Sequence, residues 1–365
     1  MYLENRVILD LCQFLNPDKE KIKDAMSRSL HWPYILGQLL FHRMGGVAYY
    51  TLKKCELLGR INREVRNSLK TIYDNNEVKA KSLSISLAEL AITLKNTNFP
   101  FALLKGAYLA SLYPSGLRTS NDVDILINQQ DISALECILK SAGFIQGNIR
   151  NGVFLPATRT EILSSRMNRG ETVPFIKKVN LPAMEYLEID INFSLDFKAK
   201  QENDIVSTIL KNTQPLIETE NGFLPTLEPS DFMIHLCCHL FKEATVYNWV
   251  EMERDLSLYK FADIDLLLNE WKTHGFFVEL ADRVCQYNLN RECYYSLLRT
   301  VEIYNLQDFR INNLLKNIIP PNTEYLTQII QPEKNKIFRY DMPYIEWLFY
   351  SGRKEKLYET SHEGT

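Results

Sequence analysis

The chain has 365 residues, of which 45% are hydrophobic and 24% charged, and its formal net charge at pH 7 is −3. This length is enough for two or three domains with a sizeable core, and the composition is that of an ordinary globular protein. The slightly acidic balance argues against a protein that mainly coats nucleic acid, because such domains are usually strongly basic.

Residues 1–95 are predicted to form an N-terminal helical region. Apolar residues recur near helical spacing through residues 60–95, which indicates one or two long amphipathic helices. The run Asn96-Thr97-Asn98, followed by Pro100, then ends the region, because these residues disfavour continuation of a helix.

A core of short strands and helices is predicted for residues 96–200. We expect strands at residues 101–104 and 122–127, and helices at residues 106–113 and 131–142. Further along, two or three strands are expected around a polar loop, at about residues 152–156, 161–163 and 173–179, with the loop at 164–170.

The most regular strand of the core is predicted at residues 185–195. Apolar and polar residues alternate there, as they do in a strand with one buried face. The apolar members are Leu187, Ile189, Ile191, Phe193 and Leu195, and the polar members are Glu188, Asp190, Asn192 and Ser194.

A C-terminal helical domain is predicted for residues 201–350, after a polar linker at residues 198–204. Ser230 is expected to cap a helix at residues 232–244, because serine is a favoured residue at that position. A second helix is expected at residues 249–271.

The predicted class is α+β, with the core between two helical regions and a loose, charged tail at residues 351–365. The seven cysteines are scattered and form no CxxC pair, so neither a disulfide framework nor a zinc ribbon is supported. We find no signal-peptide pattern at the N-terminus and no apolar run near the ~20 residues of a membrane span. A cytoplasmic protein is therefore expected.

Asp122 and Asp124 are the strongest candidates for a functional site. Strand geometry points both carboxylates to the same side, where like charges repel one another. A divalent cation between the two carboxylates would offset this repulsion. Asp190, on the later strand, is the candidate for a third ligand, and Glu188 and Asn192 share its side of the strand.

A turn that suits phosphate is predicted just before the acidic strand. Gly106 allows close approach of the backbone to a ligand, and the helix that begins there, with Ala107 in its first turn, offers free amides. Lys105 and Arg118 are cations on either side of this helix, and both side chains suit phosphate. A phosphate site beside a metal site indicates chemistry on a nucleoside triphosphate.

Two pairs of residues in the C-terminal region allow two interpretations each. His235 and His239 lie four residues apart, a spacing that can bind zinc, but no third ligand is near them in the sequence, which favours structural histidines. Lys260 and Asp263 lie one helical turn apart and form either a surface ion pair or a pair that contacts nucleotide or acceptor.

These features resemble the DNA polymerase β-like nucleotidyltransferase superfamily and, more closely, a bacterial family of uncharacterised nucleotidyltransferases. The matching motifs are Leu104-Lys105-Gly106, Tyr113-Pro114, Arg118, Asp122-Val123-Asp124 and Asp190-Ile191-Asn192-Phe193. Ala107 stands where the superfamily often has Ser or Gly, and Asn192 stands where the closer family often has His.

The resemblance implies a nucleotidyltransferase-like mixed sheet and transfer of a nucleoside monophosphate from an NTP to a hydroxyl or phosphate of an acceptor. Asp122, Asp124 and Asp190 would hold two Mg²⁺ (or Mn²⁺) ions and take part in catalysis. The residues expected to bind the nucleotide are Lys105, Gly106, Ala107, Arg118 and Lys260.

The acidic balance favours a small molecule or a peptide as the acceptor, with no membrane partner and no tight binding of nucleic acid. Two other classes remain open. Metal-dependent phosphodiester hydrolysis uses similar carboxylates, and a nucleotide-binding sensor or antitoxin-like module on the same fold would bind nucleotide without turnover.

Overall fold

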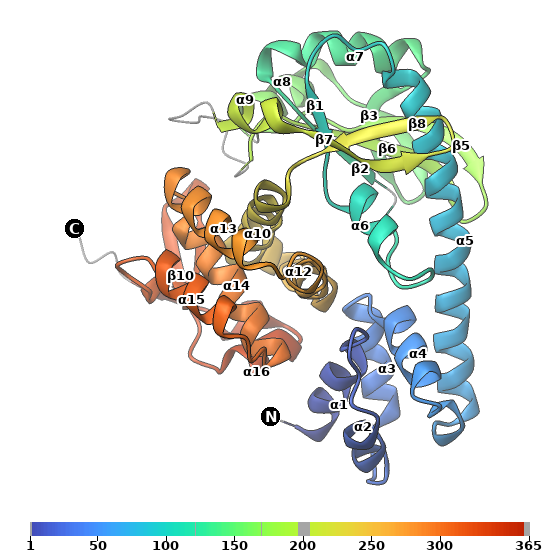
Figure 1. Ribbon diagram of the computed structural model, residues 1–365, viewed down its shortest axis with the longest axis vertical. Coiled ribbons are helices and arrows are strands. Elements are labelled where there is room, and N and C mark those ends of the chain that lie inside the picture. Colours follow the sequence, from blue (N-terminus) through green and yellow to red (C-terminus); the bar gives the residue numbers. More distant parts are fainter. Residues whose placement is uncertain (1, 121, 169, 196–204, 361–365) are drawn as a thin grey trace. The chain divides into compact units, whose positions relative to one another are not determined.

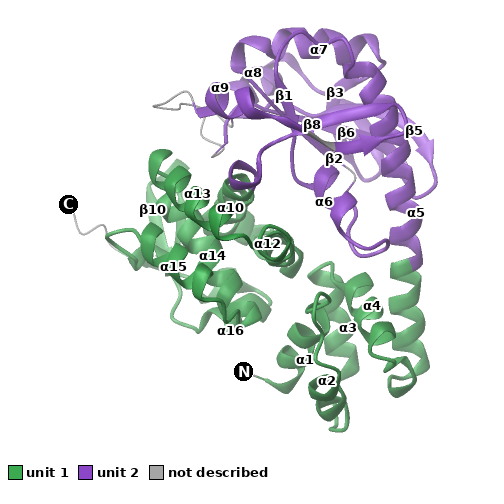
Figure 2. Ribbon diagram, viewed as in Figure 1, with its two compact units in different colours: residues 1–73, 233–365 green, residues 74–232 purple. Residues whose placement is uncertain are grey.

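The computed structural model describes residues 2–120, 122–168, 170–195 and 205–360. The chain divides into two compact units (Figure 2). Residues 1–73 and 233–365 form the helical unit, and residues 74–232 form the sheet unit. Helices α5 (Arg63–Leu94) and α10 (Pro229–Thr245) each contribute residues to both units.

An eight-stranded mixed sheet forms the core of the sheet unit (Figure 1). Its strands are β1 (Phe101–Leu103), β2 (Asp122–Ile127), β3 (Ile145–Arg150), β4 (Val153–Pro156), β5 (Phe175–Leu181), β6 (Met184–Asn192), β7 (Gln214–Thr219) and β8 (Gly222–Thr226). Their spatial order is β4-β3-β5-β6-β2-β1-β8-β7. The pairs β2–β6 and β1–β8 are parallel, and the other neighbouring strands are antiparallel. The predicted α+β class with a mixed sheet is confirmed.

The central strands β2 and β6 follow the residue pattern that the sequence predicted. In β6, Ile189 and Ile191 are fully buried, whereas Glu188 and Asp190, which alternate with them, are only partly covered. In β2, Val123 is fully buried between the two aspartates. The burial of these β-branched side chains fixes which face each carboxylate occupies, because a shift by one residue would exchange the two faces.

Four helices besides α5 belong to the sheet unit: α6 (Gly106–Leu112), α7 (Ile132–Ser141), α8 (Arg159–Asn168) and α9 (Ile205–Ile209). Helix α7 is amphipathic and buries Ile132, Leu135 and Leu139. An ion pair between Arg166 of α8 and Glu136 of α7 connects these two helices, which lie near one another in Figure 1.

The prediction of a strand at residues 161–163 is wrong, because these residues and most of the predicted loop at 164–170 form α8. The Thr158 amide and hydroxyl donate to Glu161 Oε2 at 2.7 and 2.8 Å, and the Glu161 amide donates to Thr158 Oγ1 at 3.3 Å. These reciprocal bonds are a capping box, which fixes the start of a helix.

Residues 214–226 form β7 and β8, although the sequence had suggested only helices between residues 201 and 350. Pro215, Gly222 and Pro225 interrupt any regular apolar alternation there. Strand β7 is an edge strand, where a proline without an amide hydrogen is tolerated. The polar linker predicted at residues 198–204 lies outside the described residues.

The helical unit combines both ends of the chain. Besides its parts of α5 and α10, its helices are α1 (Leu3–Cys12), α2 (Lys19–Met26), α3 (Trp32–Phe41), α4 (Gly45–Lys54), α11 (Tyr247–Glu251), α12 (Leu258–Glu270), α13 (His274–Gln286), α14 (Asn290–Tyr304), α15 (Phe309–Ile318) and α16 (Tyr344–Phe349). A small sheet of β9 (Gln328–Gln331), β10 (Lys336–Arg339) and β11 (Tyr358–Thr360) completes it. The Leu258 amide donates to His42 Nδ1 at 3.3 Å, and Gln13 Nε2 donates to the Tyr304 carbonyl at 3.2 Å, so the two ends are hydrogen-bonded to one another.

Two helix predictions in this part of the chain need correction. The helix expected at residues 249–271 is divided into α11 and α12, because Glu253 has a left-handed backbone (φ 55°) that ends α11. Ser230 is not a cap, since α10 begins at Pro229, and the Phe232 amide donates to the Glu228 carbonyl at 2.9 Å. Proline is favoured at the first helical position, and it moves the start upstream.

Residues 353–360, which the sequence analysis placed in a loose tail, belong to the fold. Arg353 is 3% exposed and forms two hydrogen bonds with Asp255, at 2.5 and 2.7 Å. Strand β11 then pairs with β10. Within the described ranges, no helix is both long enough and apolar enough to cross a membrane.

Candidate active site

Four carboxylates lie in two facing pairs on one face of the central sheet. Strands β2 and β6 are parallel, and their register places Asp122 opposite Glu188 and Asp124 opposite Asp190. Alternation along each strand puts these side chains on the same face. The structure therefore brings together the three carboxylates predicted as metal ligands, and it adds Glu188. We call these four residues the carboxylate array.

The array carries the electrostatic cost of like charges held close together. Burial, followed by the charges of Asp124, Glu188 and Asp122, raises the pKa of Asp190 well above its ordinary value, and Lys105 opposes this shift. Burial and the charges of Asp122 and Asp124 likewise raise the pKa of Glu188. Such a site favours a proton or a cation, because either relieves the repulsion.

Lys105 supplies a positive charge directly to the array. Its Nζ lies 2.8 Å from Asp124 Oδ1, and the two side chains are 16% and 6% exposed. Asn192 Nδ2 donates to the same oxygen at 3.2 Å. Asp124 Oδ1 therefore accepts from a lysine on the β1–α6 turn and from an amide on β6, which fixes the orientation of this carboxylate.

The β1–α6 turn has an unusual backbone at Lys105 rather than at Gly106. Lys105 has φ 42° and ψ −116°, a conformation that residues with a side chain rarely adopt. The residue before Lys105 is hydrogen-bonded to β2, since the Leu104 amide donates to the Asp124 carbonyl at 2.9 Å. This strained position places the lysine side chain at Asp124.

Gly106 has a packing role that the sequence analysis did not foresee. A methyl group at this position would lie 2.6 Å from Ser120 Cβ, so any side chain here would displace Ser120. The Ser120 hydroxyl donates to Asp122 Oδ1. Ser120 was missed from the sequence, where the only signal was a hydroxyl residue two positions before the first aspartate.

The other predicted nucleotide-binding residues of the sheet unit surround this turn. Ala107 is buried in the first turn of α6. Arg118 is partly buried in the segment that leads to β2, and its Nη1 donates to the Thr119 carbonyl. Neither position conflicts with the predicted contact of these two residues with the nucleotide.

Lys260 lies in the helical unit, on α12, whereas the array belongs to the sheet unit. Its ammonium forms an ion pair with Glu243 and lies 3.4 Å from the carbonyls of Arg254 and Asp255. His239 Nδ1 lies 3.4 Å from Glu243 Oε2, so both residues meet at one carboxylate. This environment is a buried ion-pair cluster.

The remaining residues of the two pairs considered for zinc or acceptor binding are also buried. His235 is fully enclosed on α10, and Asp263 is buried on α12. The structural interpretation of the histidines stays a prediction.

The donor set of the array fits a hard divalent cation by its chemistry. Mg²⁺ prefers carboxylate and other oxygen ligands. Asn192 Oδ1 is a buried amide oxygen with no hydrogen-bond partner among the described residues, and it stands beside the array. In their present orientations, no three His, Cys, Asp or Glu side chains of the described chain converge closely enough to hold a metal ion. Metal binding therefore requires the carboxylates to turn from their present partners.

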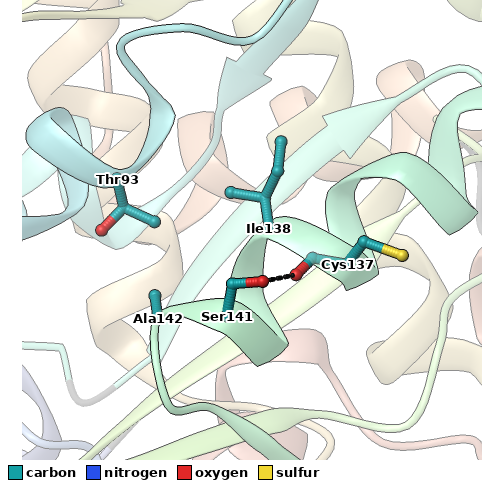
Figure 3. Close-up of a pocket in the computed structure, with 5 residues that line it drawn as sticks. All are labelled: Thr93, Cys137, Ile138, Ser141 and Ala142. Carbon is teal, nitrogen blue, oxygen red and sulfur yellow. Dashed lines mark hydrogen bonds between the residues drawn. The ribbon is translucent and has the colours of Figure 1, made fainter.

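A separate cavity lies between α5 and α7, with a volume of about 430 Å³. Thr93, Cys137, Ile138, Ser141 and Ala142 line it, as Figure 3 shows. None of these five side chains is acidic or basic, so the cavity lacks the charged groups that a triphosphate and its cation require.

Comparison with known proteins gives several solved structures and one family. The crystal structure of an antigenic nucleotidyltransferase-like protein from Paracoccidioides brasiliensis is 14% identical, with a TM-score of 0.38, over 66% of this chain and 95% of that chain. No curated protein matches. The profile of a family described as uncharacterised nucleotidyltransferase matches residues 28–305, well over half of the chain and including every member of the carboxylate array. The chain belongs to this family of uncharacterised nucleotidyltransferases.

Proposed function

We propose that the protein transfers a nucleoside monophosphate from an NTP to a hydroxyl or phosphate of an acceptor, with Mg²⁺ or Mn²⁺ as cofactor. The observation that carries this proposal is the register of β2 and β6, which sets Asp124 opposite Asp190 beside Lys105. Membership of the nucleotidyltransferase family supports the reaction class.

Each residue of the site then has a defined task. Asp122, Asp124 and Asp190 would hold the metal ions, which when bound would supply positive charge to the triphosphate. Asp190 would complete the site of the metal nearest the acceptor and so help to deprotonate the attacking group. Ser120 orients Asp122, and Asn192 orients Asp124.

The phosphates are held by groups around the β1–α6 turn. Lys105 and Arg118 provide the cations, and the amides of Gly106 and Ala107 have no partner within their own helical turn because they begin the helix. The nucleotide contact that the sequence predicts for Lys260 stays a prediction. The protein contributes mainly positioning and charge stabilisation.

A small molecule or a peptide suits the charge distribution better than a long nucleic acid. Lys178 is paired with Glu185 at 3.1 Å, Arg166 is paired with Glu136, and Lys177 lies 3.9 Å from Glu89. The charges of these two lysines and of the arginine are therefore already partly neutralised. Few phosphates of an acceptor would therefore be bound.

The test is to incubate the protein with each of four α-labelled NTPs, Mg²⁺ and a small-molecule or peptide extract, and to measure pyrophosphate release and labelled products. We expect pyrophosphate with one labelled acceptor, and neither product with Asp124→Asn. Nucleotide binding without any pyrophosphate would instead support the sensor-like alternative. Cleavage of phosphodiesters in the absence of NTP would support hydrolysis and overturn the proposal.

A further inference from the structure

The ion pair between Lys105 and Asp124 occupies an oxygen that the proposed metal site needs. The ammonium lies 2.8 Å from Asp124 Oδ1 and is largely shielded from water, since the two side chains are 16% and 6% exposed. Asn192 Nδ2 donates a second hydrogen bond to the same oxygen at 3.2 Å. A cation that approaches Asp124 must therefore compete with Lys105.

The charges around this pair give the lysine a clear electrostatic task. Asp122, Glu188 and Asp190 surround Asp124 on the same face of the sheet. Lys105 is the cation that offsets their charges at Asp190. A divalent ion placed in the array would stand next to this ammonium, and like charges at such distances repel strongly in a shielded site.

A displaced ammonium also needs a new partner. A lysine charge left unpaired in a shielded position costs free energy, because it has lost its water and its counter-ion. The triphosphate of an NTP offers several negative oxygens next to the metal that it accompanies. The strained backbone at Lys105 (φ 42°) belongs to the turn before α6, where the phosphates are proposed to bind, so the lysine can reach them while its backbone stays in place.

We propose that Lys105 is an internal counter-ion that moves from Asp124 to the triphosphate, so that metal and nucleotide bind together and each binds weakly alone. This inference rests on the proposed function, and it adds that metal and nucleotide bind to the site cooperatively. It assigns to Lys105 a positioning role as well as a contact with phosphate. The coupling between the two ligands is expected to be about tenfold or more, within the usual range for linked sites.

The test measures Mn²⁺ binding directly, from the electron paramagnetic resonance signal of free Mn²⁺. Titrations are done without nucleotide and with a mixture of the α,β-methylene analogues of ATP, GTP, CTP and UTP, which cannot release pyrophosphate. The wild-type protein should bind Mn²⁺ about tenfold more tightly, or better, when the analogues are present. The variants are Lys105→Met, which keeps the length of the side chain, and Lys105→Gly.

Both variants should bind Mn²⁺ alone more tightly than the wild type, by about tenfold, and should lose the enhancement by the analogues. Their affinity for the analogues should fall. Lys105→Gly is included because glycine adopts a positive φ without strain, so the test stands even if Lys105→Met fails to fold. Lys178→Met is the matched control, since this lysine also pairs with a carboxylate, Glu185, at 3.1 Å but is half exposed outside the array. It should behave as the wild type.

The outcomes separate the inference from the function. If the wild type releases pyrophosphate but both Lys105 variants bind Mn²⁺ alone no more tightly than the wild type, the inference is wrong and the proposed function stands. If the wild type binds no Mn²⁺ with or without the analogues, both are overturned. Equal enhancement by the analogues in wild type and Lys105→Met would also reject the counter-ion role.

Discussion

At the scale of single residues, the choice of third metal ligand is the first point to test. Asp190→Asn should lower nucleotidyl transfer by at least about 100-fold, while the melting temperature of the ligand-free protein holds or rises, because one repulsive charge leaves the array. Pyrophosphate release and thermal melting measure the two effects. If Asp190→Asn retains activity and Glu188→Gln loses it, Glu188 is the third ligand.

The contact between Gly106 and Ser120 gives a second prediction. Gly106→Ala should destabilise the protein by about 1–3 kcal/mol and reduce activity, because the added methyl group displaces the serine that orients Asp122. The double variant Gly106→Ala/Ser120→Gly should recover part of the stability, since it removes both the hydroxyl and the Cβ that the added methyl group meets. Denaturant unfolding of both variants tests this, and an equally unstable double variant would contradict it.

Asp265, on α12 of the helical unit, gives a prediction about pH. Burial raises its pKa to about 7, and the residue is 8% exposed. The folded state therefore holds a proton that the unfolded state releases near pH 4, so stability falls as pH rises from about 4 through 7. Asp265→Asn should remove this slope and be the more stable protein at pH 8, by roughly 4 kcal/mol at most. Parallel slopes for the two proteins between pH 5 and 8 would show that the carboxyl is not perturbed.

The site residues could be predicted from the sequence where spacing along one strand was enough. Asp122, Asp124 and Asp190 were identified because alternation assigns each to a face, and the register of β2 and β6 now places them side by side. Ser120 and the bond from Lys105 to Asp124 could not be predicted, because they depend on how the β1–α6 turn folds back on β2. No pattern along the chain encodes that approach.

At the scale of elements, the local signals were uneven. Strand β6 was clear because apolar and polar residues alternate from Leu187 onward, and β2 because its two aspartates lead into an apolar run. Strands β7 and β8 contain prolines and a glycine and were missed. Helix α8 has a valid start signal in Thr158 and Glu161, but its apolar spacing is weak, and a strand was predicted in its place. The capping box carried more information than the apolar pattern did.

That capping box can be tested by itself. Thr158→Ala should destabilise α8 by about 1 kcal/mol, because the hydroxyl no longer accepts from the Glu161 amide. Thr158→Ser keeps the hydroxyl and should lose much less. Hydrogen exchange of the α8 amides, measured in both variants, reports the effect locally. Equal protection in the two variants would mean that tertiary packing alone holds the helix.

At the scale of the whole molecule, the helical unit contains a buried pair of residues that are far apart in the sequence. Arg353 and Asp255 form a buried pair with bonds of 2.5 and 2.7 Å, and Arg353 Nη1 also donates to the carbonyls of Leu348 and Tyr350. Residue 353 looked like part of a loose tail because sequence alone does not reveal a partner almost 100 positions away.

Breaking this pair should therefore be costly. Arg353→Met should destabilise the helical unit by about 3–5 kcal/mol, because Asp255 is left buried and charged. The double variant Arg353→Met/Asp255→Leu should recover much of that loss, since no lone charge remains. Urea unfolding followed by tryptophan fluorescence measures both. A loss below about 1 kcal/mol in the single variant would show that water reaches Asp255.

The carboxylate array lies on β6 and β2, the fourth and fifth of the eight strands in the sheet. Amides in the middle of a sheet exchange with solvent only when much of the unit opens, so the groups proposed for catalysis are attached to the slowest-opening part of the sheet unit. Loops and edge strands carry no member of the array and can change in length or sequence without moving it. In a lineage of such proteins, the choice of acceptor would be free to diverge while the reaction itself stays the same.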